Sequence, residues 1–140
     1  MVRSIVAVVV GFLVIGALAF GMDYALMTAA PETFDFTQRV ESPPILLFAL
    51  AYVFAFATFG CWLAARLAPN GAMRHALILG VLGLAFNIAG TVALWDLMPA
   101  WYHIVALALV MPAAWVGGWI RERQLARVAI PSPAVSPTPA

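Results

Sequence analysis

The sequence is short of charged residues and of cysteine, and it has no lysine. Charged residues make up 9% of its 140 residues and hydrophobic residues 65%, against about 25% and roughly 45 to 50% in soluble domains. A chain this apolar cannot cover a surface that faces water. Because Cys61 is the sole cysteine, no disulfide can form within the chain, and thiol chemistry that needs a cysteine pair is excluded.

Sequence motifs of catalysis and metal binding are absent as well. There is no phosphate-binding loop, no cluster of metal ligands and no nucleophile beside a base. His75 and His103 lie at opposite ends of an apolar segment that would be about 33 Å long as a helix, too far apart to ligate one metal centre. We therefore expect no catalytic residue, no metal, no cofactor, no nucleic-acid partner and no enzymatic activity.

The apolar residues fall into four uncharged blocks, which are residues 5–22, 45–65, 76–94 and 104–120. About 20 such residues in a helix span the roughly 30 Å hydrocarbon core of a bilayer. The sequence therefore predicts an all-α membrane protein with four transmembrane helices in an antiparallel bundle, over about residues 4–27, 44–66, 73–95 and 101–122. The first block is longer than the apolar part of a signal peptide, so we expect it to be retained.

The arginines lie mostly on one side of this predicted bundle. If the chain crosses four times, six of the seven arginines and one glutamate share a side with net charge +5, and the other side carries −4, which sums to the +1 of the whole chain. The positive-inside rule then predicts that both termini are cytoplasmic. Arginine without lysine, together with abundant alanine, is associated with GC-rich bacterial genomes, so we expect the inner membrane of a bacterium.

The connections between the predicted helices carry the remaining polar residues. The stretch "WDLMPAWYH", residues 95–103, is predicted as a short outer hairpin whose aromatic rings lie at the headgroups while Asp96 faces water, an anchor rather than an active site. Residues 23–44 form either a plain connector or a short helix that begins near Pro31. Residues 124–140 contain four prolines and are predicted as a disordered cytoplasmic tail beyond a domain of residues 1–123.

Two segments of the chain are similar to each other. When residues 43–66 are aligned with residues 100–123, eight of 24 positions are identical, including the pairs Gly60 with Gly117, Trp62 with Trp119 and Arg66 with Arg123. One interpretation is a duplicated helix hairpin. The other is chance similarity between two alanine-rich helices.

Small residues mark the faces on which the helices are expected to meet, because transmembrane helices associate where their backbones can approach closely. The third block carries Gly80, Gly83 and Gly90 along one face, and the fourth offers Ala113, Ala114, Gly117 and Gly118. We expect these faces to form the interior of the bundle by close packing.

Asn87 shares the glycine face of the third block and is the most deeply placed strongly polar side chain. Tyr52 in the second block is expected at a similar depth, so we predict a hydrogen bond from Asn87 to a neighbouring helix, with the Tyr52 hydroxyl as the favoured partner. Polar residues within a span are also candidates for function. The alternative is a ligand site that contains Asn87, Tyr52, Thr91 and Asp23.

Several short motifs, which are "LAARLAP" followed by "RHALILG", "W…PAWY" and "PAAWVGGWIR", accompany the Arg3-led first helix. Over residues 1–123 the chain resembles a widespread family of uncharacterised small four-span bacterial inner-membrane proteins. The resemblance implies a topology and no activity.

Three functions remain open at the level of sequence. The first is a non-enzymatic bundle that serves as an accessory or self-associating subunit or binds a lipid-like or small ligand, with membrane lipids, further copies or an unidentified membrane protein as partners. The alternatives are a subunit of an oligomeric transporter or channel, and a membrane enzyme that uses the outer hairpin. A polar cavity around Asn87 would favour binding or transport, whereas a fully packed interior would favour a structural role.

Overall fold

The computed structural model describes residues 2–35 and 37–128, and these residues form helices and no strand. Four long helices, α1 (Val2–Ala29), α2 (Pro43–Leu67), α3 (Ala72–Ala93) and α4 (Ala100–Val128), are joined by three connections, the last of which contains the 3-10 turn η1 (Trp95–Leu97). Each long helix is long and apolar enough to cross a membrane. The protein is therefore a multi-pass helical membrane protein, and the all-α prediction is confirmed.

The fourth helix is longer than predicted. Residues 124–128, assigned above to a disordered tail, continue α4 to Val128, because nothing in "QLARV" interrupts a helix before Pro131. The rest of the predicted tail lies outside the described residues.

Helix boundaries follow local chemistry. Pro43 and Pro44 occupy the first turn of α2, where a missing backbone N–H costs nothing. The residue before α3 is Gly71, whose φ of 66° lies in the left-handed region that favours glycine. Pro43 and Pro44 thus start α2, whereas Pro69 to Gly71 separate the end of α2 from the start of α3 within a few residues.

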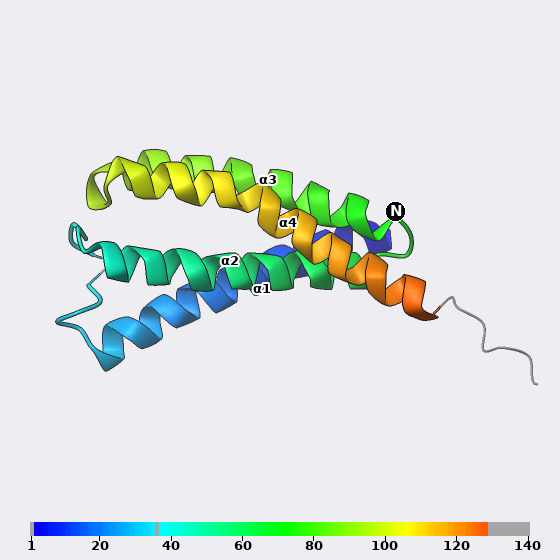
Figure 1. Ribbon diagram of the computed structural model, residues 1–140, viewed down its shortest axis with the longest axis horizontal. Helices are drawn as coiled ribbons and strands as arrows, with labels where there is room; N and C mark the ends of the chain where they lie inside the picture. The colour runs from blue at the N-terminus through cyan, green and yellow to red at the C-terminus, as the bar shows by residue number, and fades with distance from the viewer. Residues whose placement is uncertain (1, 36, 129–140) are drawn as a thin grey trace, which may run out of the picture.

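The connections gather at two ends of the molecule (Figure 1). Residues 30–42 and residues 94–99 lie at one end, which we call the two-loop end, and the backbone N–H of Val40 donates a hydrogen bond of 2.9 Å to the carbonyl of Leu97. The start of α1, the turn of residues 68–71 and the last turn of α4 lie at the other, which we call the terminal end. Residues 31–35 and 37–40 include turns but no helix, so the connector interpretation holds for the described part of that segment.

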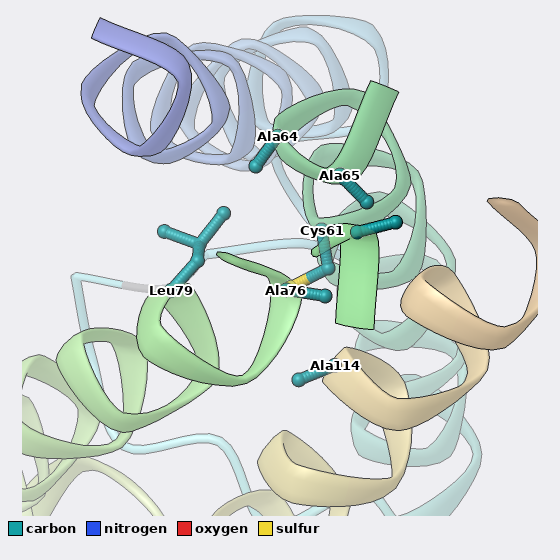
Figure 2. Packing of buried hydrophobic residues seen from close by; sticks show 7 residues of the cluster. Cys61, Ala64, Ala65, Ala76, Leu79 and Ala114 are labelled. Carbon is teal, nitrogen blue, oxygen red and sulfur yellow. The ribbon is translucent and has the colours of Figure 1, made fainter. Parts of the chain in front are cut away.

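A tight core fills the half of the bundle toward the terminal end. Its members come from α2, α3 and α4 and are mostly small, as Figure 2 shows: Cys61, Ala64, Ala65, Ala72, Ala76, Leu79 and Ala114. Small side chains allow the helix backbones to approach closely, and that contact holds helices together in lipid.

Glycines make the closest of these contacts. A Cβ atom on Gly11 of α1 would lie 2.8 Å from the carbonyl oxygen of Gly60 in α2, and one on Gly117 of α4 would lie 2.6 Å from the carbonyl oxygen of Thr58. Any larger residue at either position would force two helices apart. The expected close packing of α4 is thus observed, and α1 adds a glycine contact that the sequence analysis did not identify.

Candidate functional site

A cavity of about 760 Å³ opens between the four helices. Its volume lies within the range of roughly 300 to 1,000 Å³ typical of small-ligand sites. Most of the lining is apolar, with Phe12 and Ile15 from α1, Leu50 and Phe54 from α2, and Val110 from α4. The interior of the bundle is therefore not fully packed.

Polar side chains gather along the part of the lining that lies toward the two-loop end. They come from three helices: Asp23 of α1, Asn87 and Thr91 of α3, and Tyr102 and His103 of α4. Asn87 and Thr91 are four residues apart and so lie on one face of α3, one turn from each other. Three of the four candidate site residues named from the sequence thus line one cavity.

The fourth candidate, Tyr52, contacts this group from α2. Its hydroxyl donates a hydrogen bond to Oδ1 of Asp23, and its ring packs against Phe48 and Phe56, with centroids 5.5 and 5.8 Å away. The predicted hydrogen bond between Tyr52 and Asn87 is therefore wrong. Rotation about the axis of α2 turns the Tyr52 hydroxyl toward α1.

Asn87 makes no side-chain hydrogen bond to any of the residues that the structure describes. It faces the cavity instead of a neighbouring helix. Asn87 is half-buried, and a polar side chain left open to a cavity is available to a ligand or to water.

His103 was not among the sequence candidates, and it is the most buried polar residue of the site. The side chain is 4% exposed, its ring stacks on Trp95 at a centroid distance of 5.2 Å, and its Nε2 atom has no hydrogen-bond partner among the described residues. The signal was present, because His103 precedes Ala114 by 11 residues, just over three helical turns. It therefore lies on the face of α4 already expected to be interior.

The stretch "WDLMPAWYH" divides between two environments. Asp96 is exposed in η1, and Trp101 is also exposed, which fits an anchor at the membrane surface. Tyr102 and His103 belong to the cavity. Trp101 lies on the surface and the next two residues line the cavity because α4 begins at Ala100, and successive residues of a helix are rotated by about 100° about its axis.

The cavity is open on the side between α1 and α3. Leu13 and Phe20 of α1 and Phe86 of α3 line it while remaining 63%, 77% and 66% exposed. Phe12 and Phe86 touch edge to face at a centroid distance of 5.1 Å and bound the opening toward the terminal end. In a bilayer these residues would face lipid, so the opening connects the cavity to the membrane interior.

Not all of the glycines expected to pack closely do so. Gly80 does, because a Cβ there would lie 2.5 Å from the Cβ of Ala114. Gly83 and Gly90 line the cavity instead, and a Cβ on Gly90 would meet nothing within 4 Å. For Gly90 the close-packing expectation is wrong, whereas a Cβ on Gly83 would lie at an ordinary contact distance of 3.8 Å from Val110 of α4.

No group of three or more His, Cys, Asp or Glu side chains within residues 2–35 and 37–128 is arranged to hold a metal ion. Comparisons with family models, curated proteins and solved structures give no match to this chain. The function must therefore be argued from the cavity itself.

Proposed function

We propose that this protein is a non-enzymatic binding protein of the bacterial inner membrane that takes a lipid-like, amphiphilic ligand into its lateral cavity. The observation that supports this proposal is the division of the cavity, whose wall is apolar along most of its length and polar near the two-loop end. An amphiphile has the same division. A chain of methylene groups fits the apolar wall, and a headgroup fits beside Asp23, Asn87 and Thr91.

Access from the membrane supports the same proposal. The opening between α1 and α3 lies at lipid depth, flanked by Leu13 and Phe86, so an amphiphile enters sideways from the bilayer without passing through water. Ligands of this class reach their sites by partition into the membrane, and a water-filled entrance is not needed.

The alternative function is a subunit of an oligomeric transporter or channel. The core of Cys61, Ala64, Ala76 and Leu79 is buried across the half of the bundle toward the terminal end, and it separates the cavity from that end. A path through one chain is therefore less well supported than a binding site, and transport would require several copies around a shared path.

The topology that we propose is an antiparallel bundle with both termini in the cytoplasm. The charge difference between the two ends supports it. In a Cys61→Ala background, a cysteine at Glu32 is expected to react with an impermeant thiol reagent from outside, and a cysteine at Asn70 only after permeabilisation. Reaction of both from one side would overturn the topology.

Extraction in native lipid discs, followed by mass spectrometry of the lipids that remain bound, tests the function. Gly16→Phe fills the cavity, because a Cβ at Gly16 meets nothing within 4 Å and the residue lines the cavity. Gly21→Phe is the matched control: the residue is also unobstructed and on α1, but it is exposed and outside the lining.

We expect one amphiphile class to be enriched with the wild type and with Gly21→Phe, and to be lost with Gly16→Phe. The same lipid composition with all three proteins would contradict the proposed function. An altered oligomeric mass of Gly16→Phe with unchanged lipids would favour the transporter alternative.

A further inference from the structure

The polar end of the cavity contains one acidic side chain and, apart from the imidazole of His103, no basic one. Asp23 is the one charged residue in the lining, to which no arginine contributes, and the chain has no lysine. The single ion pair among the described residues joins Arg39 to Glu41, both exposed in the connector of residues 30–42. Asp23 thus faces the cavity without an arginine or lysine partner.

Asp23 is also held in place by the protein. The Tyr52 hydroxyl donates to its Oδ1 atom, whereas Oδ2 accepts no hydrogen bond from the residues that the structure describes. A charge in a membrane helix is costly unless it is paired or hydrated. The Tyr52 hydrogen bond fixes the position of the carboxyl group, and its Oδ2 atom remains for a ligand.

A second, independent feature also points to a missing partner. His103 lines the same cavity, is nine-tenths buried, and has no hydrogen-bond partner for Nε2 among the described residues. An unsatisfied buried ring nitrogen costs free energy comparable to a lost hydrogen bond. Asn87, also without a partner, adds a carbonyl oxygen that can accept from a ligand.

These groups suit one class of headgroup. A carboxylate and an amide oxygen accept hydrogen bonds, and a neutral imidazole accepts through one nitrogen. A phosphate or carboxylate headgroup would be repelled by Asp23 and would find no arginine in the lining. A protonated amine carries the opposite charge to Asp23 and supplies up to three N–H donors.

We propose that the cavity binds a single-chain amphiphile with a protonated amine headgroup, in which Asp23 is the counter-ion and Asn87 and His103 accept hydrogen bonds. This inference rests on the proposed function, since it names the class of ligand for the same cavity. The alkyl chain lies along the apolar wall toward Phe12 and Leu79, and the amine lies at the polar end.

Three probes that differ only in the headgroup test this proposal: radiolabelled dodecylamine, dodecanol and dodecyl phosphate, bound to the protein in phosphatidylcholine nanodiscs with binding to empty nanodiscs subtracted. We expect dodecylamine to bind about tenfold more tightly than dodecanol, the difference made by one hydrogen bond to a charged group, and dodecyl phosphate to bind most weakly. Equal affinities for the amine and the alcohol, or a preference for the phosphate, would overturn the proposal.

Variants assign the preference to its residue. Asp23→Asn is expected to bind dodecylamine and dodecanol equally, whereas Asp96→Asn removes an exposed carboxylate outside the cavity and is expected to keep the tenfold preference. An amine preference that survives Asp23→Asn, or that is lost equally in Asp96→Asn, would assign it to general surface charge and overturn the proposal. If Asp23→Asn does not fold, the ranking of the three probes on the wild type still decides.

The same measurements distinguish a wrong headgroup assignment from a wrong binding site. If Gly16→Phe abolishes binding of both dodecylamine and dodecanol but the wild type does not distinguish them, the cavity is a binding site and the amine assignment is wrong. If Gly16→Phe leaves both affinities unchanged, the cavity is not the binding site and the proposed function itself fails.

Discussion

The two halves of the bundle use the same small residues with opposite results. Toward the terminal end, Gly11 and Gly60 bring two backbones into contact, and alanines close the remaining space. Toward the two-loop end, Gly16 and Gly90 have no neighbour within 4 Å of an added Cβ, and a cavity of about 760 Å³ lies between the helices. A glycine stripe in a membrane helix thus allows close approach but does not enforce it.

The lengths of the connections between helices account for which half of the bundle is closely packed. Four residues, 68–71, join α2 to α3 at the terminal end, whereas 13 residues, 30–42, join α1 to α2 at the other. A short connection keeps the ends of two helices together, and a long one allows them to separate. Figure 1 shows α1 diverging from the α3–α4 pair toward the two-loop end, and Gly90 of α3 there has no neighbour within 4 Å of an added Cβ.

The largest expected effect comes from Leu79 in the packed half, which is 1% exposed. Leu79→Ala is expected to lower the free energy of unfolding by about 2 kcal/mol or more, because a void replaces the side chain beside Gly11. Leu82→Ala on the same helix removes a 43% exposed leucine outside the cavity. This variant is expected to change the free energy of unfolding by less than about 0.5 kcal/mol. Equal losses in reversible unfolding from detergent would show that the core does not dominate stability.

A pair of glycine substitutions should act in opposite directions. Gly60→Ala is expected to cost about 1 to 3 kcal/mol, since the new methyl group would overlap Ile15 and the carbonyl of Gly11. Gly90→Ala meets nothing within 4 Å and is expected to be neutral or to stabilise by up to about 1 kcal/mol through helix propensity. Thermal unfolding of both variants measures this contrast, and destabilisation by Gly90→Ala would mean that α3 is packed at both ends.

Removal of the Tyr52 hydroxyl should have a smaller effect on stability. Tyr52→Phe keeps the ring contacts with Phe48 and Phe56 and removes the hydrogen bond to Asp23, so we expect a loss of about 0.6 to 1.7 kcal/mol, the range of hydrogen bonds between membrane helices. The control is Tyr24→Phe, at an exposed position on α1. If the two variants are equally stable in chemical unfolding, the Tyr52 hydroxyl does not link α1 to α2.

The smallest expected effect lies in the connector of the two-loop end. The hydroxyl and backbone N–H of Thr37, and then the side chain of Gln38, donate to Asp35 and lower the pKa of its carboxyl below the ordinary 3.8. Because the pKa is lowered in the folded loop, these bonds are fully formed above pH 3.8 and are lost as the pH falls through the lowered value.

Thr37→Ala should raise the Asp35 pKa toward its ordinary value, and Gln38→Ala should raise it less, as followed by carboxyl carbon shifts in an NMR pH titration. A larger rise of the Asp35 pKa in Gln38→Ala than in Thr37→Ala would show that Gln38, and not Thr37, is the main cause of the lowered pKa. Since this turn lies outside the cavity lining, neither variant should alter binding of the amphiphile probes.

The duplicated-hairpin interpretation remains a prediction. Arg66 lies over Trp62 and Arg123 over Trp119, at 5.3 and 3.8 Å from the ring centroids, as residues four apart on any helix can. Gly60 packs on α1, however, and its aligned partner Gly117 packs on α2 and not on α3. The matched residues therefore do not make equivalent helix contacts.

The sequence by itself determined the number of long helices and their approximate bounds, because the bilayer imposes one length and requires every backbone amide to be paired within its own segment. It also identified polar residues of the interior, since asparagine, aspartate and threonine are few among the apolar side chains of the helices and therefore conspicuous. Asp23, Asn87 and Thr91 were named on that ground, and they line one cavity.

Only the tertiary structure decided how those residues are combined. Whether Tyr52 meets Asn87 or Asp23, whether Gly90 closes a contact or lines a cavity, and whether His103 is interior depend on helix rotation and crossing. These are set by a few contacts distant in sequence, such as Gly11 on Gly60. Helices in lipid gain no hydrophobic free energy from facing one way or another, so the apolar pattern that predicts a span contains little information about its orientation in the bundle.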